Sequence, residues 1–350
     1  MAPIGHHEVV MPAPVPVSAP VLLPAPSALP ADATSTGLAY HRLVFARRRR
    51  GWWTPLAVGA LGLAFYIVLM VGVTLVMFAV ASRDATLFDR MIELSQNPTV
   101  GASDPVMLVV LLGTIILMLP CYQLASLIVN GARLGLISSA AGRLRWRWML
   151  QCGLVAVVLY AVAALVSLLL PSDGQGDAAP QPLWAVSLVL ILLLVPLQSA
   201  AEEYVFRGFL AQAIGRWLRH PAFAILLPVP LFVLGHLYDV LGQLSVGLFA
   251  VAAGWLVWRT GGLEAAISLH VVNNLSGFLL SLPSGDDPTA SETGWVSFVS
   301  SLVLIAGYVA IVEWLLRRRA ARGRPLPRRL LLTPPLPVYA AASPSASRIV

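Results

Sequence analysis

Long apolar stretches without charge alternate with short polar segments along most of the chain. Stretches of about 20 such residues, the length that crosses a bilayer as a helix, recur often enough for about eight transmembrane helices. We predict these helices at 52–81, 105–129, 148–170, 182–203, 221–238, 240–258, 262–282 and 295–316. The fourth can continue as a helix past Arg207. The pattern predicts an all-α polytopic membrane protein.

The loops between these stretches differ in arginine content. Arginines gather before the first stretch and after the second, fourth, sixth and eighth, whereas loops 171–181 and 283–294 contain none. Positive residues favour the cytoplasmic side of a membrane, so we expect both termini in the cytoplasm. The net charge of +7 then reflects membrane orientation, and we expect the lipid bilayer, not nucleic acid, as a partner.

Composition supports a membrane protein. The chain is 58% hydrophobic and 11% charged, while soluble proteins have roughly 25% charged residues. All 23 basic residues are arginine, which we attribute to codon bias, and we place the protein in a bacterial cytoplasmic membrane. Cys121 and Cys152 fall within predicted helices, where we interpret them as packing residues.

The two ends of the chain differ from its middle. Proline and alanine dominate residues 1–45, and proline, alanine and arginine dominate 321–350. Such composition favours extended, disordered chain, so we predict two disordered cytoplasmic tails around a transmembrane domain at 46–320. At the helix ends we expect Asp239 and Glu264 to face water, and Glu313 to pair with Arg317.

One polar run interrupts the apolar pattern at the end of the fourth stretch: Glu202-Glu203-Tyr204-Val205-Phe206-Arg207. A charge at the bilayer centre costs roughly 2.5–3.5 kcal/mol on insertion scales, so these groups need partners or a function. Glu203 and Arg207 are four residues apart and share a helix face, while Glu202 points about 100° away. A paired and an unpaired carboxylate suggest a polar site within the membrane.

Two further predicted helices carry polar residues at helical spacing. The fifth contains Phe232-Val-Leu-Gly235-His236, and the seventh contains His270-Val-Val-Asn273-Asn274. Each could serve only as contact between helices, worth roughly 1 kcal/mol or less. Their convergence with the glutamate run on three nearby helices favours a common site.

Together these three motifs, in this order, resemble those of the CPBP (Abi) family of membrane proteins. Its members include the eukaryotic CAAX prenyl protease 2 and bacterial bacteriocin-immunity proteins. The resemblance covers about 182–282 and implies an intramembrane endopeptidase acting on a membrane protein or peptide. It implies that Glu202 is the general base, with His236 assisting it. Glu203 and Arg207 would support this base, and His270 with Asn274 would stabilise the oxyanion.

The residue chemistry agrees with hydrolysis, which needs a base near the attacking water and donors aimed at the oxyanion. Glu202, His236 and His270 could also hold a zinc ion, although the His-Glu-x-x-His spacing is absent. The cofactor therefore stays open between none and one divalent metal, and the enzyme between a glutamate-type protease and a metalloendopeptidase. Whether CAAX processing is its reaction also stays open.

One geometric difficulty accompanies this interpretation. Counted along straight helices, Glu202 lies near the cytoplasmic side and His236 nearer the outer side, so they would not meet. Tilted or broken helices would bring them together, and Pro196, Pro228 and Pro230 are placed to break them. Alternatively, the fifth helix begins in the cytoplasm and His236 is shallower.

Two other functions fit the same residues. A non-catalytic membrane protein of the immunity type would bind a partner or peptide in the same cavity. A proton-coupled transporter would use Glu202, Glu203 and His236 as a relay. The polar residues crowd into the second half of the chain, whereas transporters built from inverted repeats show matched halves.

Overall fold

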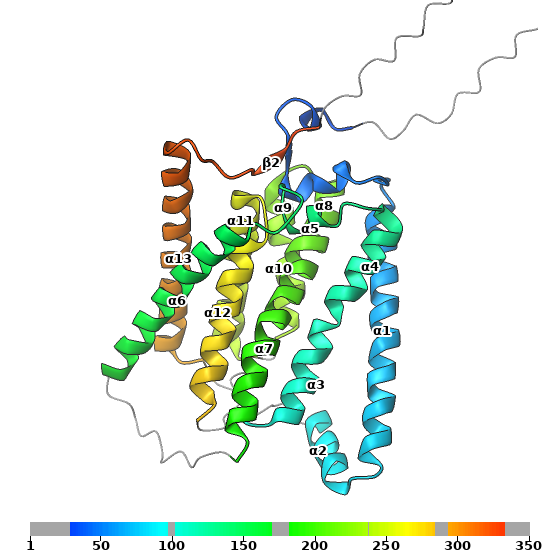
Figure 1. Ribbon diagram of the computed structural model, residues 1–350, viewed down its shortest axis with the longest axis vertical. Coiled ribbons are helices and arrows are strands. Elements are labelled where there is room, and N and C mark those ends of the chain that lie inside the picture. Colours follow the sequence, from blue (N-terminus) through cyan, green and yellow to red (C-terminus); the bar gives the residue numbers. More distant parts are fainter. Residues whose placement is uncertain (1–28, 97–101, 170–181, 237, 284–292, 333–350) are drawn as a thin grey trace, which may run out of the picture.

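The computed structural model describes residues 29–96, 102–169, 182–236, 238–283 and 293–332. Its helices form one bundle of roughly antiparallel rods, with a two-stranded sheet at one end (Figure 1). In chain order the elements are η1 (Ala31–Ala33), β1 (Leu38–Ala39), η2 (Tyr40–Ala46), α1 (Thr54–Ala81), α2 (Ala85–Gln96), α3 (Pro105–Ile116), α4 (Met118–Asn130), α5 (Gly135–Ser138), α6 (Trp146–Leu169), α7 (Trp184–Glu203), η3 (Tyr204–Leu210), α8 (Ala211–Trp217), α9 (Pro221–Leu226), α10 (Pro228–Leu234), α11 (Val240–Thr260), α12 (Glu264–Ser281), α13 (Trp295–Ala321) and β2 (Arg329–Leu330).

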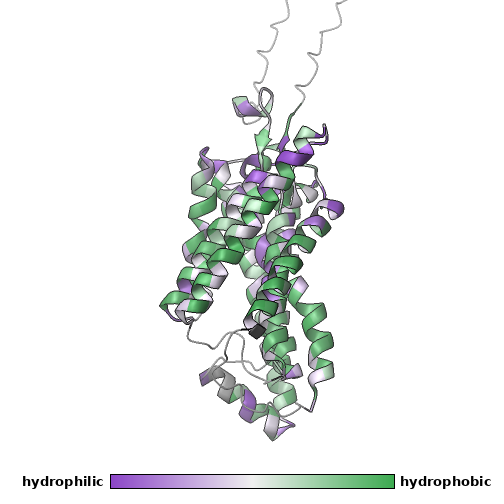
Figure 2. Cartoon of the chain, turned by 90° about the vertical axis from the view of Figure 1, so that its left-hand side faces the viewer, coloured by the Kyte–Doolittle hydropathy of each residue, from purple (hydrophilic) through white to green (hydrophobic). Residues whose placement is uncertain are grey.

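Six helical segments among the described residues are long and apolar enough to cross a membrane. They are Thr54–Ala81, Pro105–Asn130, Trp146–Ser167, Trp184–Trp217, Val240–Thr260 and Trp295–Ala321. In the most apolar part of α1, 0% of the residues are buried inside the protein, so this helix turns its apolar side chains to lipid. Hydrophobic residues dominate the middle of the helices and hydrophilic ones gather toward their ends (Figure 2). The prediction of an all-α polytopic membrane protein is confirmed.

The other two predicted crossings differ from the six. The expected helix at 262–282 is α12, which has 18 residues and carries the polar motif of His270. The expected helix at 221–238 consists of α9 and α10, an apolar segment of Pro221–Leu234. At 1.5 Å per residue it is about 21 Å long, short of the roughly 30 Å hydrocarbon layer. Eight complete crossings stay a prediction.

Parts of both expected tails are folded. β1 pairs antiparallel with β2, and the side chains of Leu38, Tyr40 and Leu43 are almost completely buried. The expectation of disorder across 1–45 and 321–350 is therefore wrong for residues 29–45 and 325–332, because apolar side chains anchor them to the bundle. The rest of these tails, 1–28 and 333–350, lies outside the described residues.

The pairing of β1 with β2 brings residues 38–39 and 329–330 together at one end of the bundle (Figure 1). An even number of crossings produces this arrangement. The cytoplasmic location of that end stays a prediction.

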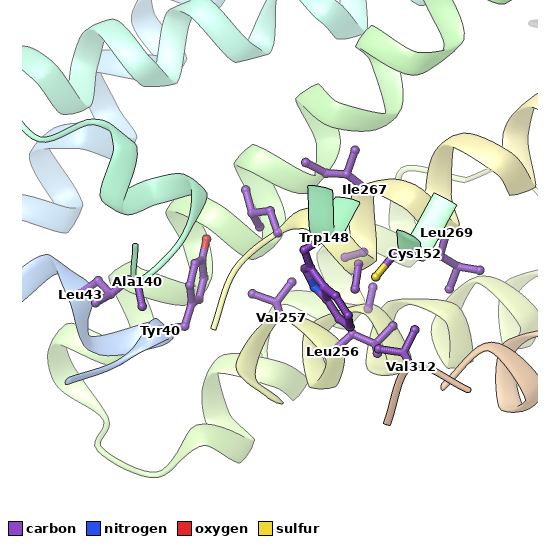
Figure 3. Close-up of a cluster of buried hydrophobic side chains, with 14 of the residues drawn as sticks. Tyr40, Leu43, Ala140, Trp148, Cys152, Leu256, Val257, Ile267, Leu269 and Val312 are labelled. Carbon is purple, nitrogen blue, oxygen red and sulfur yellow. The ribbon is translucent and has the colours of Figure 1, made fainter. Parts of the chain in front are cut away.

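The main hydrophobic core joins helices from the second half of the chain to α6. Trp148 and Cys152 of α6 pack with Leu256 of α11, Ile267 of α12 and Val312 of α13 (Figure 3). The packing role predicted for the cysteines fits their burial, since Cys121 and Cys152 are both buried and free. This core fixes α12 between α6 and α11 and so sets the position of its polar motif.

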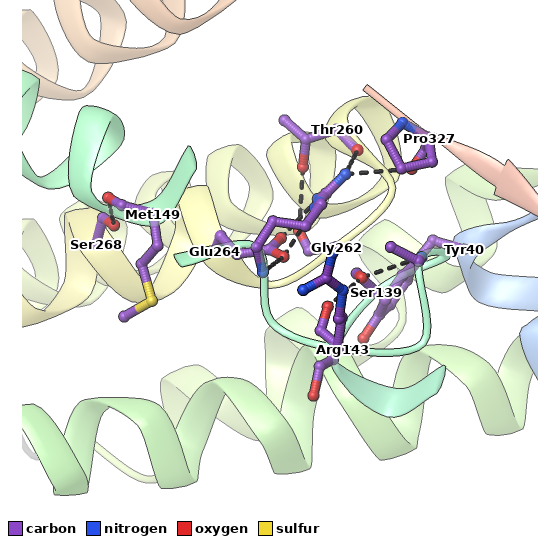
Figure 4. A network of polar contacts seen from close by, with 12 residues as sticks. Tyr40, Ser139, Arg143, Met149, Thr260, Gly262, Glu264, Ser268 and Pro327 are labelled. Atoms are coloured by element: carbon purple, nitrogen blue, oxygen red, sulfur yellow. Dashed lines mark hydrogen bonds and ion pairs between the residues drawn. The ribbon is translucent and has the colours of Figure 1, made fainter. Parts of the chain in front are cut away.

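Glu264 does not face water as expected, because it is completely buried at the start of α12 (0% exposed). Arg145 holds it: the backbone N and Nε of Arg145 each donate to Oε1 at 2.8 Å, and Nη2 donates to Oε2 at 2.6 Å. Figure 4 shows the network around Glu264, which extends through Arg145 Nη1 to the carbonyls of Thr260 and Pro327. The position of Glu264 at a helix end suggested contact with water. The tertiary fold instead places beside it an arginine that is 119 residues away in the sequence.

The remaining expectations for charges at helix ends hold. Asp239 is exposed, and its side chain accepts a hydrogen bond from the backbone N of Gly242 at 2.9 Å. Arg317 Nε donates to Glu313 Oε1 at 2.8 Å. The predicted pair on α13 is therefore confirmed.

Candidate active site

The glutamate run lies in the middle of a long helix and not at its end. α7 leads directly into η3, a π-helical segment that contains Arg207, and then into α8. The whole segment Trp184–Trp217 has 34 residues. π-helical turns are uncommon and often occur at functional sites. Glu202 is thus about 22 Å of helix away from Trp217, at 1.5 Å per residue.

The chain then reverses and returns along α9 and α10. His236 follows α10 and lies roughly as far beyond Pro221 as Glu202 lies before Trp217, about 22 Å of helix. Equal lengths on both sides of the turn bring the two motifs to a similar depth. The ring centroids of Phe206 and Phe232 lie 5.1 Å apart, which joins the two arms directly.

The proline positions explain only part of this geometry. α7 continues through Pro196 without ending, whereas α9 ends before Leu227 and α10 begins at Pro228. The predicted difference in depth between Glu202 and His236 disappears mainly because the fourth helix continues beyond residue 203, to Trp217.

Glu203 lies at the centre of the polar cluster and is 0% exposed. Its Oε1 accepts from Arg207 Nη1 at 2.8 Å and lies 2.8 Å from His270 Nδ1. Arg207 and His270 are also buried, and the guanidinium carbon of Arg207 lies 4.1 Å from the centroid of the Phe232 ring. The pair predicted between Glu203 and Arg207 is present, and the third partner is a histidine from α12.

The contact with Glu203 assigns roles to the two ring nitrogens of His270. A carboxylate that is paired with an arginine only accepts hydrogen bonds, so His270 Nδ1 is assigned as the donor to Glu203. In neutral imidazole, Nε2 then carries a lone pair and accepts. Nε2 lies 3.4 Å from Glu202 Oε2.

The facing oxygen of Glu202 is buried and has no hydrogen-bond partner within the described part of the chain. Glu202 itself is 8% exposed. Two acceptors that face each other accommodate a shared proton, or a water molecule that donates to both. A general base must lie within hydrogen-bond reach of the proton that it removes, and a water molecule between these two acceptors would meet that condition.

Asn274 is tied to the same helix as the glutamates through a residue that sequence reasoning missed. Its Nδ2 donates to Gln198 Oε1 at 3.1 Å, and Gln198 is buried. Gln198 precedes Glu202 by four residues, so both occupy one face of α7. That spacing was the available signal, although it is weak for a single glutamine.

A second missed residue comes from α6. The hydroxyl of Tyr160 donates to Asn273 Oδ1 at 2.8 Å, and Asn273 Nδ2 donates to Asn274 Oδ1 at 3.1 Å. A chain of amides therefore runs from α6 across α12 to α7. No pattern in the sequence connects Tyr160 to this chain, because α6 carries no other motif residue.

His236 stands apart from the carboxylates. Its Nδ1 lies 2.8 Å from the carbonyl of Phe232, and its ring centroid lies 4.7 Å from that of Phe232. The Phe232 ring in turn lies 6.1 Å from that of His270. No hydrogen bond or ion pair joins His236 to Glu202 or Glu203 in the described residues.

The zinc set considered from the sequence does not fit this arrangement. No three His, Cys, Asp or Glu side chains among the described residues are placed to hold one metal ion. Glu202 lies next to His270, 3.4 Å from its Nε2, but among the described residues no hydrogen bond or ion pair joins His236 to either of them. His236 bonds elsewhere, and we derive no step through a metal.

Comparisons with known proteins agree with the motifs. Residues 182–276 match the family model described as type II CAAX prenyl endopeptidase, Rce1-like, which confirms the resemblance for this segment. The chain is 32% identical over 145 residues to "Uncharacterized protein YyaK" of Bacillus subtilis (strain 168), across 38% of this chain and 47% of that protein. The match thus spans about half of this relative. No solved structure matches the chain.

Proposed function

Because residues 182–276 match an endopeptidase family, we propose that this protein is an intramembrane endopeptidase that hydrolyses a peptide bond with an activated water molecule. The observation that carries the proposal is the contact of Glu202 with His270. An unpartnered buried carboxylate oxygen faces an imidazole nitrogen at 3.4 Å. The substrate class is a membrane protein or peptide.

In the proposed reaction, a water molecule donates to Glu202 Oε2 and to His270 Nε2. As the water oxygen bonds to the carbonyl carbon, its proton passes to this pair. The same proton then moves to the amide nitrogen, the C–N bond breaks, and an amine and a carboxylic acid leave. His270 therefore acts with Glu202 as base. This role replaces the oxyanion role that the family resemblance implies, because the proton on Nδ1 is bound to Glu203 and Nε2 accepts.

The remaining residues have supporting roles in this proposal. Glu203 and Arg207 hold His270 in the tautomer that leaves Nε2 free, as the acidic partner does in a catalytic triad. Asn274, oriented by Gln198, supplies an amide donor for the developing oxyanion. His236 is half-buried and has Nε2 free once Nδ1 donates to Phe232, so it can bind substrate or water.

The test compares the parental protein with Glu202→Gln in membranes of the host cell. New chain ends in membrane proteins are identified by mass spectrometry, and cleavage of the peptides found is repeated with purified protein in detergent. We expect Glu202→Gln to lower kcat by at least about 100-fold, the lower range for general base catalysis. Glu313→Gln, which removes a carboxylate from α13, serves as the control and keeps the parental rate.

Stability measurements separate a chemical from a structural effect. Gln has nearly the same size as Glu, and its amide nitrogen can donate to His270 Nε2, so Glu202→Gln should change the unfolding free energy by only about 1 kcal/mol, the net contribution of one hydrogen bond. Parental cleavage rates in a folded Glu202→Gln protein would overturn the proposal. That result would favour the non-catalytic binding role.

A further inference from the structure

A cavity that shares no residue with the candidate active site lies at the arginine-rich end of the bundle. It has a volume of about 480 Å³ and lies between α11 and the C-terminal segment that leads into β2. Its walls include Trp255, Trp258, Arg259, Leu326, Arg328 and Arg329. A smaller neighbouring cavity of about 90 Å³ shares Arg259 and Arg328 and adds Arg317 of α13.

Positive charge in this region exceeds negative charge. Arg259 Nη2 and Arg317 Nε both donate to Glu313 Oε1, at 2.7 and 2.8 Å. Arg328 and Arg329 are exposed and pair with no carboxylate in the described structure. Four arginines thus face one carboxylate. The C-terminal end of α11 adds only about half a negative charge, which leaves the cavity strongly positive.

The location of the cavity indicates what could neutralise it. α11 has 21 residues, about the length of the hydrocarbon layer, so its last turn with Arg259 lies near the level of lipid headgroups. Tryptophan is enriched at this level because its ring is apolar and its N–H is polar. Trp255 and Trp258 are both partly buried in the cavity wall, beside the arginines.

We propose that this cavity binds the phosphate group of an anionic membrane lipid. Arg259, Arg328 and Arg329 supply guanidinium groups, which match phosphate oxygens in bidentate geometry. The two indoles line the part of the cavity next to the glycerol and the first acyl carbons. Free phosphate carries the same oxygens, and the indole walls favour the lipid form. This proposal is independent of the hydrolase, because none of these residues belongs to the candidate active site.

The test is native mass spectrometry of the full-length protein in a neutral detergent. The protein is titrated separately with phosphatidylglycerol, phosphatidylcholine and inorganic phosphate. We expect phosphatidylglycerol to bind about 100-fold more tightly than phosphatidylcholine, because each of the three arginines near an anionic lipid contributes about fivefold. The variant Arg328→Gln/Arg329→Gln should weaken phosphatidylglycerol binding by about 25-fold, fivefold for each arginine.

The matched control is Arg322→Gln/Arg324→Gln, which removes the same charge from the same chain segment outside the cavity. It should bind phosphatidylglycerol like the parental protein. Arg328 and Arg329 have exposed side chains, and β2 pairs through its backbone, so the variants should fold. If the double variant unfolds, the single variant Arg328→Gln carries the test with an expected fivefold loss.

Three outcomes decide the question. Selective binding of phosphatidylglycerol that only the cavity variant loses supports the proposal. Equal binding of both lipids, or an equal loss in the control variant, overturns it. Displacement of phosphatidylglycerol by millimolar inorganic phosphate keeps the anion site but overturns the assignment to lipid.

Discussion

Two ion pairs in this chain have the same sequence spacing and the same separation but different surroundings. Arg207 contacts Glu203, and Arg317 contacts Glu313, each across four residues and each at 2.8 Å. The side chains of Arg207 and Glu203 are 4% and 0% exposed, whereas those of Arg317 and Glu313 are 76% and 16% exposed. They therefore isolate the effect of burial on one type of contact.

We predict that Arg207→Gln lowers the free energy of unfolding by about 3–5 kcal/mol, because it leaves the completely buried Glu203 carboxylate without its cation. Loss of the guanidinium contact with Phe232 adds about 0.5–2 kcal/mol. Arg317→Gln should cost no more than about 1 kcal/mol, as exposed pairs do, and Glu313 keeps its bond from Arg259.

Unfolding can be followed by tryptophan fluorescence as an anionic denaturing detergent is added to protein in neutral micelles. The double variant Glu203→Gln/Arg207→Gln completes the cycle. It should be more stable than the sum of the single losses predicts, since no unpaired charge remains buried.

Equal losses for Arg207→Gln and Arg317→Gln would refute this reasoning, because burial would then have no influence. Strict additivity in the cycle would also contradict it, since the two side chains would not interact. Either result would also contradict the role proposed for Glu203 and Arg207, which is to hold His270 in one tautomer.

Two further predictions follow from other contacts. Gln198→Leu should lower kcat by about 10- to 100-fold with little change in KM, because Asn274 loses the partner that orients it. The control variant Gln198→Glu keeps an acceptor oxygen and should retain most of the parental rate. A change in KM alone would argue against a positioning role for Gln198. Burial lowers the pKa of His41 in η2 from its usual 6.5, so the folded state resists protonation. Its contribution to stability is complete above pH 6.5 and is lost as pH falls through the lowered value. The variant His41→Gln can still donate to the Arg219 carbonyl. As pH falls from about 7.5 to 5, it should lose less stability than the parental protein in thermal unfolding. An equal loss in both proteins would exclude His41 as the cause.

The sequence by itself determined the class of fold and the polar residues that share a helix face. Apolar runs of membrane length require helices, since backbone groups in lipid must bond within their own segment. The rule that side chains four residues apart share a face identified the pairs Glu203–Arg207 and Glu313–Arg317. It also placed His270 and Asn274 on one face of a helix.

Tertiary structure decided which of these groups meet. The continuation of α7 through η3 set the depth of Glu202, and no local pattern marks a π-helical segment. The partnership of Glu203 with His270 joins residues 67 positions apart, and that of Glu264 with Arg145 joins residues 119 apart. Spacing along one helix defines a face, but it carries no information about the neighbour that the face meets. That neighbour is chosen by packing of the whole bundle, which is why Glu203 meets His270 and Gln198 reaches Asn274.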